Sequence, residues 1–300
     1  MKASYAHYTL HFRQPAGTSR GVLTDKETYF LKLEDEDMPG VFGLGECAVF
    51  RGLSADDVPA YEDKLRELCA NISADKETDL HEFPSIRFGL ETAINDFANG
   101  CRRQPFPSDF TEGMSAIPIN GLVWMGTKEE MLHRIDDKIK AGFTTIKLKV
   151  GAIDTESELD LVRHIRKVFP PEALTIRLDA NGGFTPDNAL QKLSDFARYG
   201  IHSIEQPIKQ GQWEAMRRIC SESPIDIALD EELIGIHTPE RMGEMLDAVR
   251  PKYIILKPSL IGGFSGSQDW IMQAARRDIG GWVTSALESN VGLNAIAQWT

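Results

Sequence analysis

Residues 144–181 read TTIKLKVGAIDTESELDLVRHIRKVFPPEALTIRLDAN, and this stretch decides the fold class. It opens with a short β-rich run, Thr144–Val150, passes through a helical segment, and closes with a second β-rich run, Thr175–Ala180. Two apolar strands joined by a helix are typical of a parallel βαβ unit with a right-handed crossover. The stretch therefore predicts an α/β fold.

The strand–helix alternation continues on both sides of that stretch. The further strand candidates are Ile117–Trp124, Ser203–Glu205, Asp226–Asp230, Tyr253–Lys257 and Trp282–Leu287. Thr127 with Glu130 forms a capping box, and Thr-Pro pairs at 185–186 and 238–239 indicate further helix starts. No Gly-rich turn follows the first strand, which disfavours a doubly wound sheet. We therefore expect a TIM-like (β/α)7β barrel over residues 111–300, with the eighth strand missing from this chain.

Residues 1–110 have a different pattern. Alternating apolar and polar residues in short segments predict an antiparallel meander of three strands: Tyr5–Arg13, Thr28–Leu33 and Val41–Ala48. Helical spacing of apolar residues then predicts helices within Ala55–Asn71 and Ile86–Phe97. This order of elements indicates a small α+β domain.

The composition excludes several classes of protein. Lys and Arg total 33 against 45 Asp and Glu, a net charge of −12, which argues against nucleic acid or an anionic membrane as partner. No apolar run reaches the roughly 18 residues of a transmembrane helix. Cys47, Cys69, Cys101 and Cys220 are scattered, and we expect reduced thiols and a cytoplasmic location. The oligomeric state is not indicated.

Charged residues stand at the carboxyl ends of five successive strands, where a barrel places its active site. They are Lys149, Asp179, Glu205, Asp230 and Lys257, and the spacings of 30, 26, 25 and 27 residues correspond to one βα unit each. Side chains on a strand alternate between faces, so Lys147 shares a face with Lys149. The pattern predicts a ring of carboxylates flanked by lysines.

Such a ring favours a particular chemistry. Neighbouring carboxylates repel one another unless a cation lies among them, and oxygen ligands favour Mg²⁺ first, then Mn²⁺ or Ca²⁺. A lysine near that cation and a second ammonium loses its proton more easily and can act as a base. A metal with a lysine base suits removal of a proton α to a carboxylate. Taken singly, each acid is more often a helix cap and each lysine more often solvated; the joint pattern favours a site.

In this order and at this spacing, the strand-end motifs resemble the enolase superfamily, in its muconate-lactonising subgroup. The motifs are Lys147-x-Lys149, Leu178-Asp179-Ala180-Asn181, Glu205-Gln206-Pro207, Asp230-Glu231 and Lys257-Pro258. The resemblance covers nearly the whole chain and implies that residues 1–110 form a capping domain with substrate-specificity loops. It implies that Asp179, Glu205 and Asp230 bind Mg²⁺. It also implies that Lys149 and Lys257 act as acid and base on opposite faces of a small anionic carboxylate substrate.

Within that superfamily, Pro15–Leu23 and Thr284–Gly292 most resemble the o-succinylbenzoate synthase family of lyases from menaquinone biosynthesis. The implied reaction is dehydration of 2-succinyl-6-hydroxy-2,4-cyclohexadiene-1-carboxylate. Lys149 would remove the α-proton, Mg²⁺ would bind the enediolate, and protonated Lys149 would help hydroxide leave while Lys257 stays cationic. Dipeptide epimerases and N-succinylamino acid racemases would use the same two lysines. A non-catalytic binding barrel needs no base, so retention of both lysines argues against it.

Two further residues of the barrel region are candidates for substrate binding. Lys147 lies beside the predicted base. Arg177 matches an arginine of relatives and is expected either to touch substrate or to form an ion pair inside the barrel.

The loops contribute a second group of substrate-binding candidates. Arg20 lies in the expected loop Pro15–Gly21 and either closes the pocket over an anionic substrate or is solvated. Cys47–Ser54 is a similar loop. Ser285 and the backbone near Ser289 are expected to cradle a succinyl carboxylate at a helix start, with Ser289 as a plain N-cap the alternative.

Overall fold

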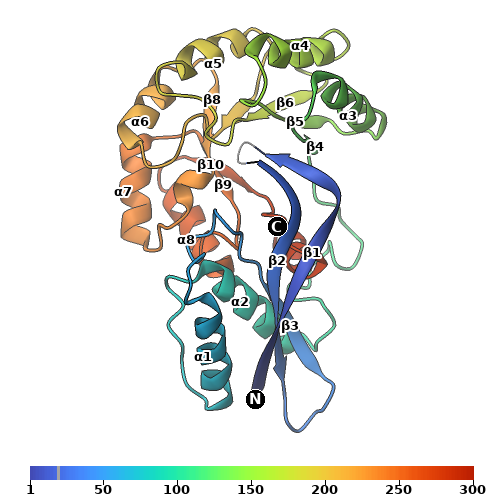
Figure 1. Cartoon of the computed structure of the whole chain (residues 1–300), viewed down its shortest axis with the longest axis vertical. Helices are drawn as coiled ribbons and strands as arrows, with labels where there is room; N and C mark the ends of the chain where they lie inside the picture. Colours follow the sequence, from blue (N-terminus) through green and yellow to red (C-terminus); the bar gives the residue numbers. More distant parts are fainter. Residues whose placement is uncertain (19–20) are drawn as a thin grey trace.

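The N-terminal region is built on a small antiparallel sheet. The computed structural model describes residues 1–18 and 21–300, and its first sheet has the order β1–β2–β3 (Figure 1). The elements are β1 (Lys2–Thr18), β2 (Gly21–Glu34), β3 (Phe42–Cys47), α1 (Tyr61–Ser73) and α2 (Pro84–Ala98). Both pairings are antiparallel, so the predicted meander is confirmed.

The second sheet is parallel, with the order β10–β9–β8–β7–β6–β5–β4. Its strands are β4 (Gly121–Val123), β5 (Thr145–Lys149), β6 (Thr175–Asp179), β7 (Ser203–Glu205), β8 (Asp226–Leu229), β9 (Tyr253–Leu256) and β10 (Gly280–Val283). The helices are α3 (Lys128–Lys140), α4 (Thr155–Arg166), α5 (Ala189–Ala197), α6 (Trp213–Glu222), α7 (Pro239–Val249), α8 (Gly263–Ala275) and α9 (Asn290–Trp299). A short 3₁₀ turn, Glu231–Leu233, follows β8. Helices α3–α8 follow the outer side of the curved sheet, confirming the barrel-like α/β fold (Figure 1).

Several local predictions are wrong. The first barrel strand, predicted as Ile117–Trp124, is confined to Gly121–Val123. Strand β10 ends at Val283, not at Leu287, and Leu287 has a φ of +62°, which no strand accommodates. Helix α5 begins at Ala189 rather than at the Thr-Pro pair, because the Thr185 amide donates to Asn188 in a preceding turn. Strand β1 continues through the expected loop as far as Thr18, which pairs with Gly21.

The N-terminal sheet packs on α2 through glycines. A Cβ atom on Gly45 of β3 would lie 1.8 Å from the carbonyl oxygen of Gly89 in α2, so the two backbones touch there. On the adjacent strand, Tyr29 stacks against Tyr61 of α1, with ring centroids 5.4 Å apart. These contacts fix β2 and β3, and through them the segment that follows β3.

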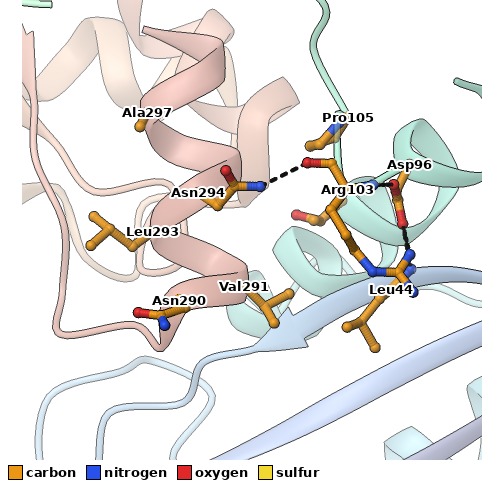
Figure 2. Close-up of a pocket in the computed structure, with 10 residues that line it drawn as sticks. Leu44, Asp96, Arg103, Pro105, Asn290, Val291, Leu293, Asn294 and Ala297 are labelled. Carbon is orange, nitrogen blue, oxygen red and sulfur yellow. Dashed lines mark hydrogen bonds and ion pairs between the residues drawn. The ribbon is translucent and has the colours of Figure 1, made fainter. Parts of the chain in front are cut away.

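Helix α9 joins the barrel region to the N-terminal region. Asn294 and Gln298 both donate to the carbonyl oxygen of Arg103, at 2.9 and 3.0 Å, and Figure 2 shows the Asn294 contact beside the Arg103–Asp96 ion pair. A cavity of about 620 Å³ lies between these residues and Leu44 of β3. The described residues contain no helix long and apolar enough to cross a membrane.

Replacing Gly45 with Ala should lower the free energy of unfolding by about 3 kcal/mol, since backbone must move to admit the methyl group. Gly40→Ala is the control: Gly40 has open space around it but a φ of +86°, so only left-handed strain applies, about 1 kcal/mol. Urea denaturation followed by circular dichroism measures both. Equal losses would show that β3 and α2 do not depend on this close approach.

Candidate active site

Parallel pairing brings the strand-end charges to one level. Lys149 of β5 pairs with Asp179 of β6, and Asp179 pairs with Glu205 of β7. Paired residues of neighbouring parallel strands point to the same face of the sheet. Asp230 follows β8 directly and Lys257 follows β9, so both also lie at this edge.

Lysines form ion pairs with all three carboxylates at this edge. Lys147 Nζ lies 2.6 Å from Glu205 Oε2 and 2.8 Å from Asp179 Oδ2. Lys149 Nζ lies 2.5 Å from the same Asp179 oxygen, and Lys257 forms an ion pair with Asp230. The exposed fractions of Asp179, Glu205 and Asp230 are only 0, 1 and 2%. The three predicted carboxylates and three predicted lysines therefore converge.

The electrostatics differ among the three acids. Burial opposes ionisation of Asp179, but Lys147 and Lys149 hold its pKa well below the usual range. Burial together with the charge of Asp179 raises the pKa of Glu205 well above its usual value. Burial also opposes ionisation of Asp230, and Lys257 outweighs it to leave a lowered pKa. Glu205 is thus the carboxylate whose negative charge is least compensated.

The donor set fits a hard divalent cation. Glu205 Oε1 is buried and has no hydrogen-bond partner among the described residues, and two more carboxylates flank it. The ammonium group of Lys147 lies between Asp179 and Glu205. In residues 1–18 and 21–300, no three His, Cys, Asp or Glu side chains are already arranged closely enough to hold a metal ion. Three carboxylates are ligands that Mg²⁺ accepts, and they leave further coordination positions free.

A cavity of about 120 Å³ opens beside these charges. Its polar lining includes Lys147, Lys149, Asn181, Lys257 and Ser285. Its apolar lining includes Leu122, Trp124, Ala286 and Leu287 from the barrel region, with Phe50 and Leu53 from the loop after β3. The N-terminal region thus supplies part of the wall, from the predicted loop Cys47–Ser54.

The remaining predicted binding residues lie in different places. Ser285 lines the cavity, but Ser289 does not: it caps α9, and its amide and hydroxyl both donate to Glu46, at 2.9 and 2.5 Å. A protein carboxylate therefore already takes up these donors at the helix start. Arg177 is half-buried and stacks on Trp282, 3.9 Å from the ring centroid. Arg20 lies outside the described residues.

Sequence reasoning missed several residues at the cavity. Asn181 Oδ1 accepts from Lys149 Nζ at 2.6 Å, and Asn181 Nδ2 donates to Glu231 at 3.1 Å. The sequence could have indicated Asn181, because it stands only two residues after Asp179, the last residue of β6, and so lies at the same edge of the sheet. Phe50 lies in the predicted loop Cys47–Ser54 and Trp124 ends the predicted strand Ile117–Trp124, but neither side chain carries a charge that would have singled it out.

The sequence profile described as "Enolase C-terminal domain-like" matches residues 130–300. The o-succinylbenzoate synthase of Desulfotalea psychrophila is 45% identical over the whole chain and 90% of its own length. The chain belongs to the enolase superfamily. The L-Ala-D/L-Glu epimerase of Bacillus subtilis, with 29% identity over 87% of this chain and 74% of its own length, is more distant.

Solved structures of the superfamily agree. The crystal structure of MenC from Desulfotalea psychrophila has a TM-score of 0.87 and 41% identity, covering all of this chain and 90% of its own. The o-succinylbenzoate synthase from Thermosynechococcus elongatus, solved with Mg in the active site, has a TM-score of 0.77 and 25% identity, over 99% of this chain and 88% of its own.

Saturating Mg²⁺ should stabilise the protein, by about 2.7 kcal/mol at one hundred times its Kd, because it binds only the folded carboxylates. Thermal unfolding with Mg²⁺ or EDTA measures this as a rise in Tm. The rise should be lost in Glu205→Gln and kept in Glu244→Gln, an exposed acid on α7. Equal rises in both variants would contradict metal binding at Glu205.

Proposed function

We propose that this enzyme dehydrates 2-succinyl-6-hydroxy-2,4-cyclohexadiene-1-carboxylate to o-succinylbenzoate, as a carbon–oxygen lyase of menaquinone biosynthesis. The observation that carries the proposal is the pair of lysines, Lys149 and Lys257, at a cavity beside three buried carboxylates. The 45% identity to an o-succinylbenzoate synthase, extending over 90% of that enzyme, supports the choice of reaction.

Asp179, Glu205 and Asp230 are the proposed ligands of Mg²⁺, with Mn²⁺ as a substitute. When bound, the cation supplies positive charge that stabilises negative charge developing on the substrate carboxylate. Lys147 contacts two of these acids and adds a fixed positive charge at the same place. Burial opposes its charge, but Asp179 and Glu205 raise the pKa of Lys147, so it remains an ammonium.

Lys149 is the proposed base. Asn181 and Asp179 accept from its Nζ, which fixes the position of this nitrogen at the cavity. As the free amine, Lys149 takes the proton α to the carboxylate. As the ammonium, it returns a proton to the departing hydroxyl, so one C–H and one C–O bond break and water leaves. A positioned base of this kind contributes roughly 10²–10⁴-fold.

Lys257 is the proposed electrostatic partner. Burial opposes its charge, yet Asp230 and Glu205 raise the pKa of Lys257, which therefore stays cationic. A fixed ammonium stabilises the anion that forms after proton removal, on the face opposite the base.

The walls of the cavity are proposed to select the substrate. Phe50 and Leu53 offer apolar surface to a six-membered ring, and the Ser285 hydroxyl is the proposed donor to the succinyl carboxylate. The division into a capping domain, residues 1–110, and a catalytic domain, residues 111–300, belongs to the same proposal. So do substrate contacts by Arg20 or Arg177 and a cytoplasmic location.

A dipeptide epimerase is the second candidate. One observation favours it: the same two lysines suit a proton transfer between the faces of a substrate, and an epimerase matches 87% of this chain. The N-succinylamino acid racemase reaction uses these lysines in the same way.

Lys149→Ala should lower kcat of the Mg²⁺-dependent dehydration by about 10⁴-fold, because the α-proton then has no acceptor. Lys252→Ala is the control, since Lys252 is exposed just before β9. Loss of substrate absorbance measures the reaction, with circular dichroism as a check on folding. A folded wild-type protein that turns over L-Ala-L-Glu but not the cyclohexadiene would transfer the proposal to the epimerase reaction.

A further inference from the structure

One buried lysine of the N-terminal region takes no part in the mechanism above. Lys26 of β2 is 93% buried (7% exposed), and its Nζ has no hydrogen-bond partner among the described residues. Burial lowers the pKa of Lys26, and the nearby charges of Glu288 and Glu46 oppose that effect. Burying an ammonium without a hydrogen bond is costly, and this burial sets Lys26 apart from the exposed lysines of the chain.

Glu288 connects this lysine to the wall of the cavity. The carboxylate of Glu288 accepts from the Ala286 amide at 2.7 Å and from the Ser259 hydroxyl at 2.5 Å. Ala286 and Leu287 line the cavity, and Ser259 is two residues after Lys257. Leu287 adopts a left-handed φ of +62°, a conformation that is strained for a residue with a side chain. The Glu288 carboxylate therefore holds a strained piece of the active-site wall.

Glu46 performs a similar task at the start of α9. It is fully buried and accepts from the Thr28 hydroxyl of β2 at 2.9 Å, from Ser289, and from the Gly292 amide at 2.9 Å. A Cβ on Gly292 would lie within 2.9 Å of both Glu46 and Glu288, so the two acids crowd the same turn. The two acids are thus buried together where β2, β3 and α9 meet. Lys26 lies two residues before Thr28 on β2, so its buried side chain is on the same face of the strand as the Thr28 hydroxyl that donates to Glu46.

We propose that Lys26 is a positioning residue for the active site, whose ammonium balances Glu288 and Glu46 and so lets Glu288 hold the wall segment 284–287 in place. The proposal deepens, and rests on, the proposed dehydration. On this proposal the N-terminal region affects the cavity in two ways: Phe50 contacts it directly, and Lys26 acts on it through Glu288. Lys26 does not itself line the cavity.

The first test is kinetic. Lys26→Met should lower kcat/KM for dehydration by roughly 10- to 100-fold, chiefly through KM, because a displaced wall binds substrate poorly. Lys26→Arg should restore activity to within about threefold, since the charge is kept. Lys32→Met is the matched control: Lys32 is on the same strand, but pairs with Glu34 at 2.9 Å away from the cavity. Equal kinetics for Lys26→Met and Lys32→Met would overturn the proposal.

The second test is a double-mutant cycle. Glu288→Gln removes the charge that Lys26 balances, so adding Lys26→Met to it should cause little further loss in kcat/KM. This double variant also tests the proposal if Lys26→Met alone fails to fold, because it restores the net charge of the group formed by residues 26, 46 and 288 to that of the wild-type protein. Losses that multiply would show that the two residues act independently.

The third test does not depend on turnover. Hydrogen exchange should be faster in a peptide spanning 284–292 of Lys26→Met, and unchanged in α7. If the wild-type protein fails to dehydrate the substrate, the proposed function fails while this measurement still decides the role of Lys26. Unchanged exchange at 284–292 would overturn the role itself.

Discussion

Three buried carboxylates at neighbouring strand ends repel one another, and the active site is arranged around that repulsion. Asp179, Glu205 and Asp230 are each at most 2% exposed. Lysines from β5 and after β9 offset part of the charge, and one oxygen of Glu205 has no hydrogen-bond partner in the part of the chain that the structure describes. The proposed divalent cation would supply the missing positive charge, so one electrostatic requirement would account both for metal binding and for lysines placed close to a substrate.

The register of the parallel strands brings these charged residues together. Parallel pairing places Lys149, Asp179 and Glu205 at one level, which loops alone would not do. The N-terminal region adds Phe50 and Leu53 to the wall of the cavity. Its buried Glu46 accepts a hydrogen bond from the Ser289 amide at the start of α9. The residues proposed for the chemistry thus lie at the strand ends, while residues from both the N-terminal region and the barrel region form the wall of the cavity.

The strand-end charges were predictable from the sequence because each follows one βα unit after the last, and the repeat fixes their side of the sheet. The end of β10 was not, since Thr284 is itself a residue that favours strands and the left-handed φ of Leu287 cannot be read from the residue types. The anion cradle proposed at Ser289 is already filled by Glu46, 243 residues away in sequence. Lys26 gave no signal because its burial exists only after the two regions pack.

A crystal structure of the protein with Mn²⁺ and o-succinylbenzoate tests the central claim most directly, because anomalous scattering locates the metal. The account predicts one metal ion bonded to Asp179, Glu205 and Asp230, with the product carboxylate beside it. It also predicts the side chains of Lys149 and Lys257 on opposite faces of the product ring. A metal bound elsewhere, or both lysines on one face of the product, would contradict the account.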